Sequence, residues 1–339
     1  MVALMAKSPS SSISGSPLHV TPLVGKFVEE LIAFRRDVHR HPELSYREHK
    51  TTERIMTRLE RAGLKPVRFS RTGCYVDIGH GPLAVALRAD IDALPIHEKT
   101  GLEFASQNED VMHACGHDIH QTVMLGVALT LADIDSSAPL AGTVRVIFQP
   151  AEEQLPGGAL SVIKEGALEG VPRAFALHCE PKVDVGKVGT RIGAITSATD
   201  TIKLKVSGRG GHTSRPHLTE DLIYAMGQIA INVPAVLSRN LDVRSGVLVV
   251  WGQIEAGVAP NAIPSTGYMA GTMRCLDADA WYRAGELLDE VVEQVSAPYG
   301  VSVELEHVPG VPPVVNTEEE TTLLENAARA ELGLSLIHI

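Results

Sequence analysis

The sequence predicts an α/β fold of two domains, in which helices cover a central sheet and a smaller domain is inserted late in the chain. The length of 339 residues is enough for about two domains of ~150 residues each. Apolar runs of strand length alternate with helical patterns in the first half, as in an α/β sheet. After Gly193, apolar and polar residues alternate instead, which indicates strands with one solvated face.

Composition and charge exclude several classes of protein. The formal net charge is −11, from 30 Lys and Arg against 41 Asp and Glu, so we expect no nucleic-acid partner, which would need a basic face. No apolar run approaches the ~20 residues that cross a bilayer, so we expect no membrane partner. The four cysteines lack the spacing of a disulfide framework, which favours reduced thiols and a cytoplasmic location.

The N-terminal part begins with a serine-rich stretch, residues 1–20. It lacks the ~7-residue apolar core of a signal peptide and is predicted to be a disordered tail. A helix is expected to start at Thr21, an N-cap that is followed by proline. Ser45 and Glu48 have the spacing of a capping box before a second helix over 51–62.

The next elements alternate between strands and a long helix. The pattern predicts, in order, a strand over 83–87, a helix over 118–131, and strands over 144–148 and 174–177. In the helix, apolar residues recur at four-residue steps and predict a buried stripe. These residues are Ile119, Val123, Val127 and Leu131.

The inserted domain is predicted over 192–308, with a βαββαβ-like order of elements. Its first strand is indicated by the alternation of Ile202, Leu204 and Val206 with polar residues. The elements expected after it are a helix over 220–231, strands over 247–254 and 267–274, and a helix over 278–295. A further helix over 317–332 would return the chain to the first domain.

The segment His113–His120 is the densest polar cluster of the sequence. Cys115 and His117 precede the predicted helix over 118–131, at an expected strand-to-helix turn, so both side chains can face one ion there. A thiolate with an imidazole suits zinc or a similar borderline metal. The alternative is a buried cysteine beside Asp118 as a helix cap, and the residues leave both interpretations open.

Two adjacent carboxylates, Glu152 and Glu153, follow the strand predicted over 144–148. One can bind a metal while its neighbour takes a proton from water. The alternative is a solvated acidic turn. Three further polar side chains stand at the ends of predicted strands, namely Asp90, Asp92 and His178. The sequence therefore predicts that ligand-type side chains converge at one edge of the sheet.

Six segments together resemble one known family. They are His39–Ser45, Arg88–Pro95, His113–His120, Gln149–Glu153, Gly208–His212 and Ala259–Pro264. The resemblance, over about residues 25–330, is to the hippurate-hydrolase and indole-acetyl-amino-acid-hydrolase branch of the dinuclear aminoacylase/carboxypeptidase metallopeptidases. It implies an α/β metallopeptidase-type catalytic domain, with a mixed sheet and flanking helices, over 21–191 and 309–333. It also implies that 192–308 is an inserted ferredoxin-like α+β domain that serves for dimerisation and as a lid.

The resemblance implies two divalent metal ions, and the ligands do not distinguish zinc, manganese, cobalt and nickel. Cys115 would bridge the two ions, with His117, Glu153 and His178 as further ligands. Asp90 stands where other branches of the family carry a histidine that binds the metal, and His117 would be the metal ligand here instead.

The implied activity is that of an amidohydrolase that cleaves N-acyl amino acids, of the hippurate or indole-acetyl-amino-acid kind, with metal-activated water. Glu152 would be the general base, and Asp92 would orient a ligand. His212 would reach across a homodimer to polarise the scissile carbonyl, while Asn261 and Arg274 would hold the substrate. A dipeptidase or carboxypeptidase on the same site is the alternative activity. For His212, the alternative is a surface histidine without a role.

The end of the chain departs from the family pattern. The family completes its catalytic domain with further strands and a last histidine ligand, whereas here the predicted helix is followed only by Gly333 and residues 334–339. These residues resemble a translated sequencing adapter, so we expect an artefactual tail on a truncated chain. His338 lacks the context of the missing ligand. An inactive truncated family member is therefore a further alternative.

Overall fold

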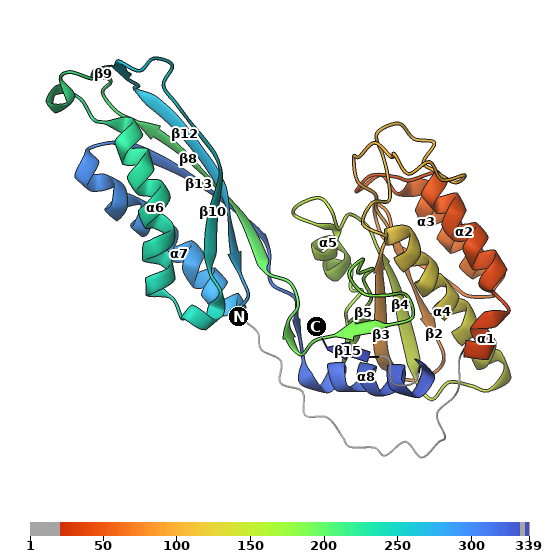
Figure 1. Ribbon diagram of the computed structural model, residues 1–339. Coiled ribbons are helices and arrows are strands. Elements are labelled where there is room, and N and C mark those ends of the chain that lie inside the picture. Colours follow the sequence, from red (N-terminus) through yellow and green to blue (C-terminus); the bar gives the residue numbers. More distant parts are fainter. Residues whose placement is uncertain (1–20, 333–335, 339) are drawn as a thin grey trace. The chain divides into compact units, whose positions relative to one another are not determined.

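The computed structural model describes residues 21–332 and, for the backbone alone, residues 336–338 (Figure 1). The predicted tail over 1–20, and residues 334, 335 and 339 of the predicted artefactual tail, lie outside the described residues. The chain divides into two compact units. The first comprises the residues up to Glu152, Ser161–Val188 and the segment from Leu324, and the second comprises Glu153–Leu160 and Gly189–Leu323. The catalytic and dimerisation roles given to the two domains remain predictions.

The first unit is built on a five-stranded sheet with the strand order β1-β2-β4-β3-β5. Its strands are β1 (Val67–Arg68), β2 (Cys74–Ile78), β3 (Leu83–Asp90), β4 (Thr143–Gln149) and β5 (Ala174–Ala176). β2 is antiparallel to β4, whereas β3 runs parallel to both β4 and β5. The sheet is therefore mixed, which confirms the predicted fold class.

Helices cover both faces of this sheet (Figure 1). The helices outside the inserted βαββαβ segment are α1 (Thr21–Gly25), α2 (Val28–Arg40), α3 (His49–Arg61), α4 (His117–Ser137), α5 (Gly158–Lys164) and α8 (Glu318–Leu332). In β4, Val146 and Phe148 pack in the core that α3 and α4 share with the sheet. Ile147, between them, packs with Val162 of α5 on the other face. Side chains alternate between the faces of a strand, so β4 is buried on both sides.

The buried stripe predicted for α4 is wrong at its first two positions, whereas its last residue, Leu131, packs against the core. Ile119 and Val123 are each 39% exposed, whereas Leu125 and Ala128 are buried in the core and His120 is buried towards the strand ends. The helix is apolar around most of its circumference, so the four-residue steps did not identify which side faces the sheet. The polar first turn of α4 faces inwards, because His117 and His120 have hydrogen-bond partners there.

The capping box predicted before α3 is also wrong. Glu48 occupies the N-cap position without a side-chain capping bond, and Ser45 Oγ donates instead to Asp92 Oδ2 at 2.6 Å. The carboxylate of Glu43 caps the helix, since its Oε2 accepts from the Thr51 N–H at 2.7 Å. Since Glu48 Oε1 accepts the Ala151 N–H, both predicted members of the capping box bind residues that are distant in the sequence.

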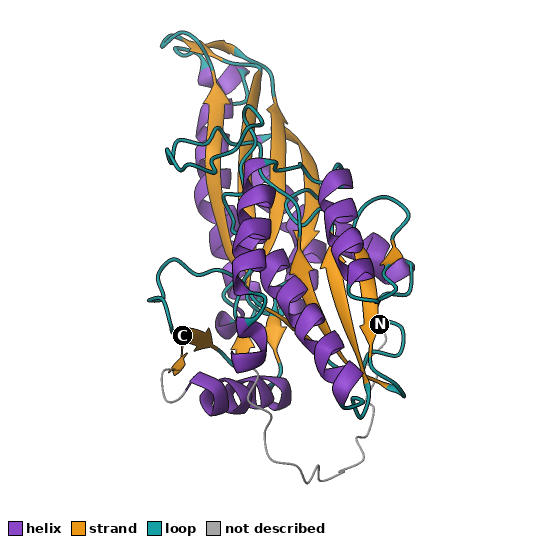
Figure 2. Ribbon diagram, turned by 90° about the vertical axis from the view of Figure 1, so that its right-hand side faces the viewer, coloured by secondary structure: helices purple, strands orange, loops and turns teal. Residues whose placement is uncertain are grey.

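The second unit contains a four-stranded antiparallel sheet with two helices (Figure 2). In chain order the elements are β8 (Ala198–Ser207), α6 (Leu222–Asn240), β10 (Leu248–Ala256), β12 (Thr266–Cys275), α7 (Ala278–Ser296) and β13 (Ser302–Val311). The βαββαβ order and the strand order β10-β12-β8-β13 are those of a ferredoxin-like fold, as predicted. One core beneath α6 and α7 includes Leu204, Met269 and Leu288.

Short elements complete the description. They are β6 (Val188–Thr190), β7 (Gly193–Ala194), β9 (Gly211–His212), β11 (Ala262–Ile263), β14 (Val315–Asn316), β15 (Leu336–His338) and the 3-10 turns Pro216–Leu218, Val243–Ser245 and Ala297–Tyr299. Among the helices of the described residues, none is both long and apolar enough to cross a membrane.

Candidate metal centre

The parallel strands β3, β4 and β5 bring their carboxyl ends to one edge of the first sheet, where sites in α/β folds form. Asp90 ends β3, and His178 follows β5 by two residues. His117 arrives differently, as the first residue of α4. The segment that leads to it holds only isolated bridges, such as Leu94 with Met112, so the predicted strand-to-helix turn is wrong and a long loop takes its place.

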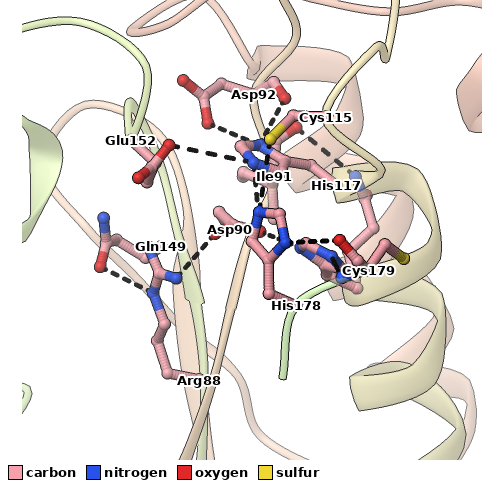
Figure 3. A network of polar contacts seen from close by, with 12 residues as sticks. Arg88, Asp90, Ile91, Asp92, Cys115, His117, Gln149, Glu152, His178 and Cys179 are labelled. Carbon is pink, nitrogen blue, oxygen red and sulfur yellow. Dashed lines mark hydrogen bonds and ion pairs between the residues drawn. The ribbon is translucent and has the colours of Figure 1, made fainter. Parts of the chain in front are cut away.

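Ligand-type side chains gather at this edge (Figure 3). Three groups have one ligand atom per residue within 4.8 Å of each other: Cys115, His117 and His178; Asp90, His117 and His120; and His117, Glu152 and Glu153. His117 belongs to all three groups. The structure thus brings together the side chains that the sequence analysis named as metal ligands.

The ring of His117 is held by Asp92. Nδ1 of His117 donates to the Asp92 backbone oxygen at 2.9 Å and lies 3.2 Å from Asp92 Oδ1. Nε2 then faces Asp90 Oδ1 at 3.6 Å and Glu152 Oε2 at 3.9 Å. A carboxylate that holds one nitrogen of a ligating histidine fixes its tautomer and orientation. Burial by itself lowers the pKa of His117, but the hydrogen bond to Asp92 and the nearby carboxylates raise it to about 11.

A second chain of contacts, which the sequence analysis missed, supports the His178 loop. Arg88 donates to Asp90 Oδ2 at 2.7 Å, and His120 Nδ1 donates to Asp90 Oδ1 at 2.6 Å. His120 Nε2 in turn accepts the Cys179 N–H at 2.8 Å. The signal in the sequence was the spacing of His120 three residues after His117, which places both on one side of a helix.

Gly116 lets this loop approach the start of α4. Its φ is +92°, and a Cβ at this position would lie 3.1 Å from both Cβ and Sγ of Cys179. Cys115, next to it, has its Sγ 3.4 Å from Nε2 of His178. This contact with Cys115 is the main reason why the pKa of His178 is raised to about 9.

The second unit holds the other predicted site residues. His212 lies in β9, which pairs with β11, and the Asn261 backbone oxygen accepts the Thr213 N–H at 3.2 Å. His212 and Asn261 are therefore neighbours, and both are exposed. Arg274 is also exposed, but it lies near the far end of β12, opposite Thr199 of β8. From Thr266 to Arg274 the strand extends ~27 Å, so the structure does not bring Arg274 to Asn261 within one chain.

The donor set fits two divalent ions. A thiolate, imidazoles and carboxylates are the ligands that zinc and related transition metals take, and several of these donors are buried and oriented by neighbours. His117 is shared by all three groups, so the groups form one continuous centre. The residues present therefore suit a dinuclear site.

Comparison with known proteins identifies the family. A match to peptidase family M20/M25/M40 covers residues 86–339. The chain belongs to this family. Membership confirms the predicted resemblance and the expected class, a metal-dependent hydrolase of amide bonds. A Bacillus subtilis crystal structure, described as a dinuclear metal-binding peptidase from the M20 family, is 35% identical with a TM-score of 0.77, covering 93% of this chain and 82% of that one.

Two of the curated relatives carry the names of a deacetylase and an amidohydrolase. The N-acetyl-L-cysteine deacetylase of Bacillus subtilis is 38% identical, over 88% of this chain and 72% of that protein. The N-acyl-L-amino acid amidohydrolase of Geobacillus stearothermophilus is 35% identical, over 88% of this chain and 80% of that protein. A Rhodococcus jostii protein with the name of a glutamate–cysteine ligase is 43% identical, but the chain spans only 38% of its length.

Proposed function

We propose that this M20 family member hydrolyses the amide bond of N-acyl amino acids, of the hippurate or indole-acetyl-amino-acid kind, at the centre around His117. The observation that carries the proposal is the convergence of Cys115, His117 and His178 with Glu152 and Glu153 at the ends of parallel strands. The names of the deacetylase and amidohydrolase relatives support the substrate class.

In the proposed site, Cys115, His117, Glu153 and His178 would hold two divalent ions, and Asp92 would orient His117. The bound ions supply Lewis acidity, which makes water a nucleophile at neutral pH. Glu152 is the general base, because its side chain is 44% exposed and its Oε2 faces His117 Nε2 at 3.9 Å. It would take a proton from the attacking water and deliver it to the leaving nitrogen.

His212 is proposed to donate to the developing oxyanion. Its Nδ1 accepts the Ser214 N–H at 3.1 Å, so a neutral ring carries its proton on Nε2. That nitrogen is then a donor, and one such donor contributes about 3 kcal/mol to stabilising the transition state. The hydrogen bond from Ser214 thus prepares the exposed ring for the role that the family resemblance implies.

Substrate preference tests the function. We expect the metal-loaded protein to cleave hippurate, N-acetyl-L-cysteine or indole-acetyl amino acids with a kcat/KM at least ~10-fold above that for dipeptides. The released amine reports the rate. A preference for dipeptides would identify an exopeptidase on the same centre, and the absence of any hydrolysis by the metal-loaded protein would refute the proposal.

A homodimer through the second unit is proposed as the active form. β10 is an edge strand of its sheet, and Leu248, Val250 and Ile254 expose apolar side chains along it. A free edge with apolar residues favours pairing with another strand. Asn261 and Arg274 lie near opposite ends of β12, so a small substrate cannot contact both residues of one chain. If both residues hold the substrate, they come from two subunits, which favours a dimer.

We predict that His212 acts on the site of the partner subunit. His212→Ala and Glu152→Gln are each expected to be inactive, but a heterodimer of the two contains one site with both side chains intact. Co-expression with two different tags isolates this heterodimer, whose rate should be about half that of the wild-type dimer. Tagged wild-type heterodimers are the control. If His212 served its own chain, no site would be complete and the mixed dimer would stay inactive.

A further inference from the structure

Glu48 is a buried carboxylate that belongs to none of the metal-ligand groups. Its side chain is 0% exposed. Oε1 accepts the Ala151 N–H at 2.7 Å, and Oε2 accepts the hydroxyl of Thr72 at 2.7 Å. Burial raises the pKa of Glu48, while the hydrogen bonds from Thr72 and Ala151 act in the opposite direction.

The Ala151 N–H lies in a turn with an uncommon backbone. Ala151 has a φ of +51°, in the left-handed region that residues other than glycine rarely adopt, and it is fully buried. It follows Pro150 and directly precedes Glu152. A backbone in this conformation persists only where its surroundings hold it. The bond from Ala151 to Glu48 is such a restraint, at the point where the chain leaves β4.

The loop between β1 and β2 closes around the same turn. Gly73 has a φ of +81°, and a Cβ there would lie 2.5 Å from the Phe148 oxygen and 2.6 Å from Cδ of Pro150. The Gly73 N–H donates to Thr52 Oγ1 of α3 at 2.8 Å. The start of α3 and this loop therefore enclose the turn, and Glu48 provides the acceptor for its backbone.

We infer that Glu48 is a positioning residue, whose carboxylate fixes the Ala151 turn and thereby the direction in which Glu152 and Glu153 project. The inference rests on the proposed function, in which these two side chains are the base and a metal ligand. A base or ligand that is displaced by ~1 Å can lose on the order of 100-fold in rate. Glu48 never touches the substrate in this scheme and acts only through the turn.

The test compares Glu48→Leu with Glu48→Gln in the full chain. Leucine fills the space but cannot accept the Ala151 N–H, whereas the glutamine Oε1 can. We expect Glu48→Leu to lower kcat ~10–100-fold with KM within ~3-fold. Titration of the metal-free protein with Zn²⁺ should show ~10-fold weaker binding, because Glu153 is displaced too. Glu48→Gln should stay within ~3-fold of the wild type in both measurements.

Thr72→Val is the matched control, since it removes the other hydrogen bond to Glu48 and leaves the Ala151 bond in place. We expect its kcat and zinc affinity to stay within ~3-fold of the wild type. Wild-type values for Glu48→Leu would overturn the inference, as would equal losses in all three variants. Should Glu48→Leu fail to fold, an ester in place of the Ala151 amide removes the same N–H, and an unchanged kcat and zinc affinity in that variant would overturn the inference instead.

The two proposals fail separately. If Glu152→Gln kept the wild-type rate, Glu152 would not be the base and the proposed mechanism would be wrong. The zinc titration of Glu48→Leu would still measure the placement of Glu153, because it requires no turnover. Weaker zinc binding would then support Glu48 as a positioning residue, and unchanged binding would refute it.

Discussion

Replacing Cys115 by alanine is expected to remove most of the bound metal and to lower amide hydrolysis by at least ~100-fold. Sγ of Cys115 lies 3.4 Å from Nε2 of His178 and belongs to a ligand group with His117. The thiolate of Cys115 would place a negative charge beside the bound cations. Alanine would leave mainly neutral imidazoles there, which balance the positive charge of the cations less well. Metal content per chain by elemental analysis, together with the rate on an N-acyl amino acid, measures both effects.

Cys179→Ala is the matched control for this prediction. Its thiol is half-buried beside Gly116, close to the centre, but it belongs to none of the ligand groups found among the described residues. We expect it to keep two ions per chain. A Cys115→Ala protein with its full complement of metal would show that the thiolate is not a ligand, whatever the rate.

The adjacent glutamates should respond differently to the same chemical change. Glu152→Gln is expected to keep its metal and to lose ~10²–10⁴-fold in kcat, because an amide cannot accept the proton of the attacking water. Glu153→Gln is expected to bind metal ~10–100-fold more weakly. Each variant serves as the control for the other, since both replace a carboxylate by an amide of the same shape on the same turn.

Metal titration and steady-state kinetics of the two variants separate these roles. The assignment depends on the placement of both carboxylates with His117 in one ligand group, and on the position of Glu152 Oε2 3.9 Å from His117 Nε2. Equal losses of metal and of rate in the two variants would contradict the division into base and ligand.

The sequence alone determined the elements that carry the site. Apolar runs predicted β3, β4 and β5 with their polar ends, and the alternation after Gly193 predicted the βαββαβ unit. These features are local, because the period of apolar residues and the breaks at proline and glycine can be recognised within a short segment of the sequence. The ligand-type residues were also visible, because each follows a predicted strand or precedes a predicted helix.

Only the tertiary structure decided which side chains hold those residues in place. Ser45 and Glu48 have the spacing of a capping box, yet Ser45 binds Asp92 and Glu48 binds the Ala151 backbone. His120 likewise accepts the Cys179 N–H, 59 positions along the chain. A local pattern contains no information about such partners, because hydrogen bonds form between groups that packing brings together. A hydrogen bond joins the buried carboxylate of Glu48 to the left-handed turn at Ala151, 103 positions along the chain, so this contact is not evident until the chain has folded.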